Sequence, residues 1–292
     1  MHTQKGQALL IVLLSMAVIL TVVLSILGRS VTDVTITSRE EEAIRAFSAA
    51  EAGIEEGLVQ QELTGVIAQP NFEGASFEAN IDSIGEGQPR FVYPLQIDSG
   101  ESATVWFISH DEAESLVCNP THPCFSGSAF KVCFGGDQAF SAPSSMPAVE
   151  VAVVYLTAVE NPATAKVARA AFDSNTSRIA TNRFNSAGGG SCVIEGETFA
   201  FSAGVDLAAL GIPSSVYNTP GALQFAQVRF LYNTQPQPLG IDTTGVLPSQ
   251  GKMVASTGKS GEATRKIEVA RLFADLPPIF QSVVYSPGGI TK

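Results

Sequence analysis

Charged residues and histidines are scarce in this sequence. Only 15% of the 292 residues are charged, and 17 Lys and Arg are outnumbered by 28 Asp and Glu. A nucleic-acid-binding protein needs a basic patch that neutralises phosphates, so this balance argues against nucleic acid as a partner. The three histidines are His2, His110 and His122. Three histidines are too few to favour histidine-based catalysis or a multi-histidine metal site. We therefore expect that the protein is not an enzyme and that it binds no metal and no cofactor.

The longest uncharged stretch lies near the N-terminus. Residues 8–27 contain no charge and no proline, and their only polar side chains are Ser15, Thr21 and Ser25. About 20 apolar residues in a helix cross the hydrocarbon core of a bilayer. No A-x-A pattern follows this stretch, which argues against removal by ordinary signal peptidase. Lys5 and the N-terminal amine precede this stretch, and Arg29 and then Asp33 follow it. This slight charge bias favours a single pass with the N-terminus in the cytoplasm.

A helical pattern continues beyond the apolar stretch. Residues 31–63 contain no proline, and apolar side chains recur at spacings of three, four and seven. This spacing predicts one apolar stripe of an amphipathic helix. The stripe consists of Ile36, Ala43, Phe47, Ala50, Ile54 and Leu58. We therefore predict one helix over 7–64, with a transmembrane half and an amphipathic half that forms a stalk.

The residues on either side of the helix start carry a family resemblance. A short polar leader ends in Gly6, and the apolar helix begins at Gln7. This resembles the class III signal peptide of type IV pilin-like proteins. Residues 45–55, RAFSAAEAGIE, are similar to the A-F-x-A-A-E-A-G-x-E segment of PilX-like minor pilins; Phe47, Glu51 and Ile54 belong to this stretch.

The resemblance implies how the chain is processed and what it contacts. A prepilin peptidase would remove residues 1–6 by cutting between Gly6 and Gln7, and the new N-terminus at Gln7 would be methylated. The remaining helix would hold the chain in the membrane and then pack against the helices of other pilin subunits.

Three positions depart from the major-pilin pattern. Gln7 stands where major pilins usually have Phe, and Gly28 stands where they often have Pro. Gly can still weaken the helix locally. Ile11 replaces the Glu that pairs with the N-terminal amine of a neighbouring subunit. Without that carboxylate one axial contact is impaired, so the resemblance implies a low-copy subunit at the filament tip.

Beyond residue 64 the helical period gives way to short runs rich in Val, Ile, Phe and Tyr, separated by Gly- and Pro-rich turns. The runs predict strands at 76–81, 90–97, 103–109, 130–134, 149–158, 166–172, 198–202, 223–232, 265–273 and 280–285. The fold class is therefore α+β, with a long N-terminal membrane-spanning helix and a β-rich, mostly antiparallel extracytoplasmic head at 65–292. A Gly-rich stretch at 186–191 marks a place where the head could divide.

One short motif in the head suggests a phosphate-binding loop. Thr257-Gly258-Lys259-Ser260 resembles the tail of such a loop, but Met253 occupies the position of its first Gly. We interpret residues 257–260 as a surface turn.

Four cysteines lie in the predicted head: Cys118, Cys124, Cys133 and Cys192. An even number in an oxidising compartment favours two disulfides. A turn-rich loop could bring Cys118 and Cys124 together, which would leave Cys133 for Cys192. Free thiols, or a metal site that includes His122, are the alternatives, although the spacing does not match structural zinc sites.

These patterns predict a minor pilin-like structural subunit of a type IV pilus or a related secretion filament. The chain would reside first in the cytoplasmic membrane and then in a cell-surface filament, with its helix in the filament core and its head exposed. The alternative is a single-pass membrane-anchored β domain that binds a surface without polymerising. The sequence names no surface ligand.

Overall fold

The computed structural model describes residues 7–60, 64–111, 113–136 and 145–275. The chain forms two compact units. The first comprises Met1–Ile81 and Val254–Val269, and the second comprises Asp82–Met253 and Ala270–Lys292. The Gly-rich stretch at 186–191 lies on strands inside the second unit, not at a boundary. The predicted leader (1–6) and the strand predicted at 280–285 lie outside the described residues.

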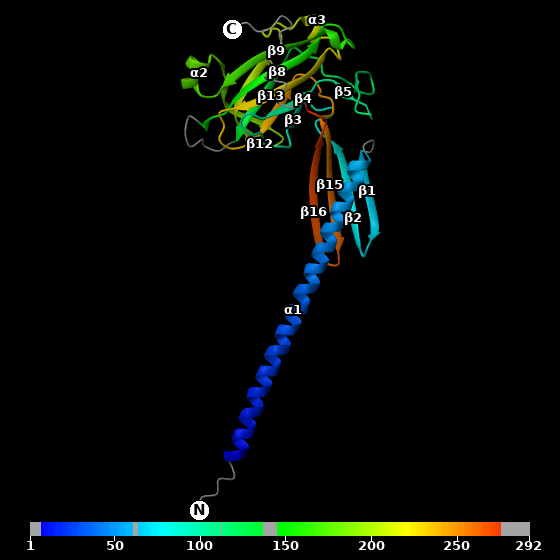
Figure 1. Cartoon of the computed structure of the whole chain (residues 1–292), viewed down its shortest axis with the longest axis vertical. Coiled ribbons are helices and arrows are strands. Elements are labelled where there is room, and N and C mark those ends of the chain that lie inside the picture. Colours follow the sequence, from blue (N-terminus) through cyan, green and yellow to red (C-terminus); the bar gives the residue numbers. More distant parts are fainter. Residues whose placement is uncertain (1–6, 61–63, 112, 137–144, 276–292) are drawn as a thin grey trace, which may run out of the picture. The chain divides into compact units, whose positions relative to one another are not determined.

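The first unit combines one long helix with a four-stranded sheet (Figure 1). Helix α1 runs over Gln7–Val59, five residues shorter at its C-terminal end than predicted. The sheet contains β1 (Gly65–Phe72), β2 (Ala75–Ser83), β15 (Gly251–Ser260) and β16 (Ala263–Leu272), in the order β1-β2-β15-β16. Along β2 buried and more exposed residues alternate, because successive side chains of a strand point to opposite faces.

The second unit contains two five-stranded sheets. One has the order β10-β9-β8-β13-β4, formed by Asn185–Ser186, Ala165–Asp173, Ala148–Leu156, Leu223–Leu231 and Ser102–Trp106. The other has the order β11-β12-β7-β14-β3, formed by Gly188–Ile194, Glu197–Asp206, Ala129–Gly136, Leu239–Thr243 and Arg90–Val92. The smaller elements are β5 (Ser109–His110), β6 (Leu116–Val117), η2 (Pro162–Thr164), α2 (Thr176–Asn182) and α3 (Ser214–Tyr217).

One hydrophobic core joins the inner faces of these two sheets. Val105 on β4, Val151 on β8 and Phe230 on β13 contribute from one sheet, and Phe134 on β7 and Ile241 on β14 contribute from the other. All five side chains are fully buried. Neighbouring strands of these two sheets pair antiparallel, except β10 with β9. The α+β class with a mostly antiparallel β-rich part is therefore confirmed.

All nine strands predicted within the described residues are present at least in part. Seven further strands were not predicted: β1, β11, β14 and β15, and the two-residue strands β5, β6 and β10. The interpretation of residues 257–260 as a surface turn is wrong, because all four residues lie on β15. Gly258 allows β15 to pack closely against the helix and does not form a turn.

Candidate functional site: the N-terminal helix

The first part of α1 exposes its apolar side chains. The large hydrophobic residues between Leu9 and Leu27 are 45–68% exposed. Ser15 and Thr21 donate their hydroxyl hydrogen bonds to Val12 O (2.9 Å) and Val18 O (2.8 Å), so the helix itself satisfies these polar groups. Among the described residues α1 is the one helix that is long and apolar enough to cross a membrane. Ile11, 61% exposed, lies on this surface.

In the middle part of α1, residues 28–30 and 32–41 are exposed. Glu41 and Arg45 form an i,i+4 ion pair at 2.5 Å on its surface. A Cβ atom added to Gly28 would meet no atom within 4 Å, so nothing in the fold requires glycine at that position. From residue 28 to residue 45 the helix rises about 26 Å at about 1.5 Å per residue.

The last part of α1 packs on the four-stranded sheet through small side chains. Ala46, Ala49 and Ala50 are fully buried, and Ala49 belongs to a cluster with Ala75 and Phe77 of β2. One turn further on, Ile54 packs against Ile81 of β2 and Val254 of β15. These contacts connect the helix to both central strands of the sheet.

Glycines permit an unusually close approach between the helix and β15. A Cβ atom built on Gly258 would lie 2.6 Å from the backbone nitrogen of Ala50, so β15 passes directly against the helix backbone. On the helix side, a Cβ at Gly53 would lie 2.7 Å from the Phe77 ring, and one at Gly57 would lie 2.6 Å from Val254 Cγ1. Real Cβ atoms do not approach other atoms this closely, so a larger residue at any of these positions would force a shift. At Gly258 the neighbouring atoms belong to the helix backbone, whereas at Gly53 and Gly57 they belong to side chains.

The buried face differs from the predicted apolar stripe. Ala50 and Ile54 lie on it as predicted, but Ile36 (50% exposed) and Phe47 (46% exposed) do not. The true face is centred on Ala46, Ala49, Ala50, Gly53 and Gly57, which recur at spacings of one, three and four. The prediction followed side-chain size, whereas the sheet selects small residues that allow the backbone to come close. Glu51 is exposed and takes no part in this docking.

Gly258 of β15 was missed by sequence reasoning, and so were the helix residues Ala46, Ala49, Gly53 and Gly57. The signal that could have identified them is the repeat of Ala and Gly at helical spacing within RAFSAAEAGIEEG. Gly6 lies outside the described residues, and Gln7 is the first residue of α1.

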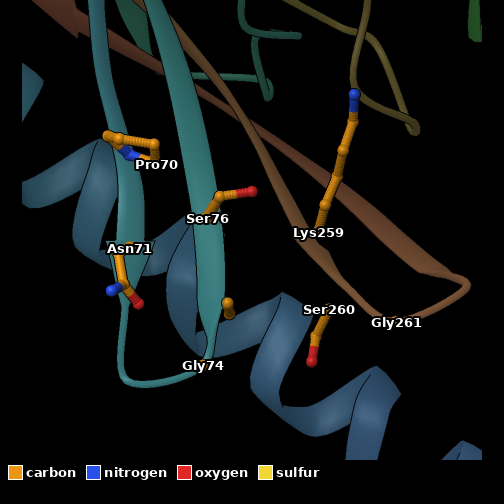
Figure 2. Close-up of a pocket in the computed structure, with 8 residues that line it drawn as sticks. Pro70, Asn71, Gly74, Ser76, Lys259, Ser260 and Gly261 are labelled. Carbon is orange, nitrogen blue, oxygen red and sulfur yellow. The ribbon is translucent and has the colours of Figure 1, made fainter.

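A polar pocket of about 310 Å³ lies where the ends of β2 and β15 diverge beside α1 (Figure 2). It is lined by the two hairpin ends, Pro70, Asn71, Gly74, Ala75, Ser76, Lys259, Ser260 and Gly261. In Figure 2 the Ser260 side chain points toward the helix, whereas the Lys259 side chain points away from it. The helix also holds one hairpin end directly, because Glu42 accepts a hydrogen bond from the Glu262 backbone N–H at 3.3 Å. The lining offers hydroxyl, amide and amine groups but no carboxylate, and we assign no chemistry to it.

Both disulfides lie in the second unit. Cys118 pairs with Cys124 at a Cα–Cα distance of 5.6 Å, and Cys133 pairs with Cys192 at 6.0 Å. The second bond joins the central strand β7 to the edge strand β11. All four cysteines are bonded, so none remains as a free thiol or as a thiolate for the alternative metal site. Within the part of the chain that the structure describes, no group of three or more His, Cys, Asp or Glu residues is placed to hold a metal.

Two titratable side chains of the second unit have shifted pKa values. Burial lowers the pKa of His110, against the opposing effect of Glu114 and Asp111. For Asp173 burial alone would raise the pKa, but hydrogen bonds from Arg178 and its other partners outweigh it and lower the pKa. The Asp173 side chain is fully buried and its ion pair with Arg178 is 2.7 Å long. Asp173 is held by hydrogen bonds from Arg178 and Asn182, and the His110 ring stacks on Phe273.

A scan against protein-family models, a search of curated proteins and a search of solved structures give no match for this chain.

Proposed function

We propose that this chain is a minor pilin-like structural subunit of a type IV pilus or a related secretion filament. The observation that supports the proposal is the division of α1 into an exposed apolar part and a part docked on the sheet. A helix of this kind needs an apolar environment for one part while the other part carries a folded unit. The resemblance of residues 1–11 and 45–55 to pilin-like sequences supports the same assignment.

In this proposal the apolar part of α1 exchanges one environment for another. Before assembly lipid surrounds residues 9–27, and after assembly the helices of neighbouring subunits do. Fully burying a Val, Leu or Ile side chain contributes about 1.5–3 kcal/mol relative to water, and lipid supplies a comparable environment. Tight side-chain packing between helices, rather than escape from water, would therefore decide which environment is preferred.

Processing supplies the first test. We expect the mature protein to begin at Gln7 with one methyl group on its amine, measured by mass spectrometry of the N-terminal peptide. Gly6→Leu should block the cut and leave Met1 in place, whereas Gly28→Leu, which alters an exposed glycine of the same helix, should be processed normally. A surface-assembled protein that retains Met1 would rule out this processing.

Position in the filament supplies the second test. Ile11 offers no carboxylate to the amine of a neighbour, and an unpaired buried charge costs roughly several kcal/mol. We therefore place the subunit at the tip, and immunogold labelling should mark filament ends. Ile11→Glu should let the chain enter the shaft, and Val12→Glu, which moves the carboxylate about 100° around the helix, should not. Regular decoration by the wild-type chain would refute the tip location, and labelled membranes without labelled filaments would favour the anchored β domain.

A further inference from the structure

The last described residues of the chain, 271–275, form a strap on the second unit. At its centre the Phe273 ring stacks on His110, with centroids 3.9 Å apart and an interplanar angle of 14°. The His110 ring also contacts Trp106 of β4, which lies nearly perpendicular to it (89°) with centroids 4.5 Å apart. Phe273 in addition donates its backbone N–H to Gln250 O at 3.2 Å. His110 therefore connects the middle of the strap to the edge strand β4.

Polar contacts hold the two ends of the strap. Arg271 forms an ion pair with Glu114 at 2.7 Å. The Asp275 carboxylate accepts hydrogen bonds from Thr104 on β4 and from Gln227 on β13, which are cross-strand partners. The strap is thus held at both ends and in the middle. Of these contacts only the one in the middle contains a side chain whose ordinary pKa lies between about 5 and 8, the imidazole of histidine.

The surroundings of His110 suit a neutral ring. Its Nδ1 is buried and has no hydrogen-bond partner among the described residues. In a protonated ring both nitrogens carry N–H groups, so Nδ1 would become a buried donor without an acceptor. Burial would also remove the positive charge of the ring from water, which is unfavourable.

The carboxylates near the ring are already engaged. The charged groups that act on His110 are Asp111 and Glu114 of its own loop, and the strap adds Arg271 and Asp275. Glu114 is paired with Arg271, and Asp111 accepts hydrogen bonds from two backbone N–H groups at 3.0 and 2.8 Å. Burial therefore outweighs both carboxylates and lowers the pKa of His110.

We propose that His110 is an acid-sensitive latch, whose neutral ring holds the strap against β4 and whose protonation releases residues 271–275. A charged ring turns toward water and competes with Arg271 for the Glu114 carboxylate. Protonation thus weakens both the stack on Phe273 and the ion pair at the start of the strap. The latch is independent of the filament proposal, because all of its residues belong to the second unit.

Trp106 is the single tryptophan of the chain and reports on the latch. We expect its acrylamide quenching constant, measured on the full chain in detergent, to rise about twofold from about pH 7.5 to about pH 5, because the indole loses a ring contact. His110→Phe keeps an aromatic ring but cannot be protonated, so its constant should stay low at both pH values. His122→Phe is the matched control and should respond like the wild type, because His122 also has a buried Nδ1 without a partner among the described residues.

The outcomes that contradict the latch are distinct. An equal quenching constant at both pH values in the wild type would overturn it. An equal rise in the wild type and in His110→Phe would also overturn it, because another group would then be the sensor. Circular dichroism of all three chains should be unchanged between the two pH values, and a loss of signal at the lower one would show unfolding instead of local release.

Linkage between protonation and release supplies a second test. If protonation releases the strap, then loosening the strap must favour protonation to the same extent. Phe273→Leu should therefore raise the pKa of His110 toward its usual 6.5, measured by NMR of the histidine ring signals. Phe184→Leu is the control, because the Phe184 ring contacts Tyr232, and it should leave this pKa unchanged. An unchanged His110 pKa in Phe273→Leu, or an equal change in both variants, would contradict the latch.

Discussion

Gly258→Ala tests the close contact between β15 and α1. The added Cβ would lie 2.6 Å from Ala50 N and 3.1 Å from the Ala46 carbonyl carbon. Both atoms belong to the helix backbone and cannot rotate away, so the helix or the strand must move. Overpacking typically costs about 1–3 kcal/mol, and a contact with backbone on both sides belongs at the upper end of that range. We expect a loss of about 3 kcal/mol in the free energy that holds the helix on the sheet.

Hydrogen exchange measured by mass spectrometry gives the assay for Gly258→Ala. A loss of about 3 kcal/mol corresponds to exchange roughly 150-fold faster, since each 1.4 kcal/mol is a factor of ten. We expect this increase for the amides of residues 46–57. Gly204→Ala is the matched control. It makes the same substitution on a different strand, β12, where the added Cβ would meet no atom within 4 Å. If both variants exchange like the wild type over 46–57, the helix is not packed against β15 as described.

Three further predictions concern the second unit. Burial lowers the pKa of His110 below its usual 6.5, so the free energy of unfolding should be highest above about pH 6.5 and should fall as the pH drops toward the folded-state pKa. His110→Phe should remove this dependence on pH, measured by urea unfolding at several pH values, and an unchanged dependence would exclude His110 as its source. Asp173→Asn should lower the free energy of unfolding by about 3 kcal/mol, because it leaves the partly buried charge of Arg178 without its carboxylate partner; a loss below about 1 kcal/mol would mean that the pair behaves like an exposed one. Replacing Cys133 and Cys192 by Ala should lower the free energy of unfolding by about 4 kcal/mol, because this disulfide closes a loop with a sequence separation of 59. Replacing Cys118 and Cys124 should cost about 2 kcal/mol, because the separation is only 6. Equal denaturation midpoints for the two variants would contradict this explanation by loop entropy.

The sequence patterns predict the helix and many of the sheet strands, because the periodicity of apolar residues indicates which face of a helix or strand is buried. They fail where pairing imposes a strand on residues of low strand propensity. Gly188–Ile194 forms β11 because β12 and the Cys133–Cys192 bond hold it, and β15 contains Gly258, Lys259 and Ser260 because two strands flank it. In such segments the adjacent strands of the sheet determine the structure, and a single sequence does not show which strands will be adjacent.

The candidate site shows a similar division. Leu9 to Leu27 could be identified from length and composition alone, since a membrane-length apolar helix needs no partner to be recognised. The docked face could not be identified in this way. Phe47 is the largest apolar residue in this part of α1, yet it lies outside the docked face, because close contact with β15 favours small side chains that let two backbones approach.

The Cys133–Cys192 bond also has a mechanical meaning. The 59-residue loop that it closes contains all of β8 and β9. When tension acts on the two ends of the chain, the force passes through the sulfur bridge and bypasses these strands. At about 3.4 Å per residue, roughly 200 Å of contour length is withheld from extension until the bond is reduced. Oxidation therefore limits how far this unit can be stretched, in addition to how stably it folds.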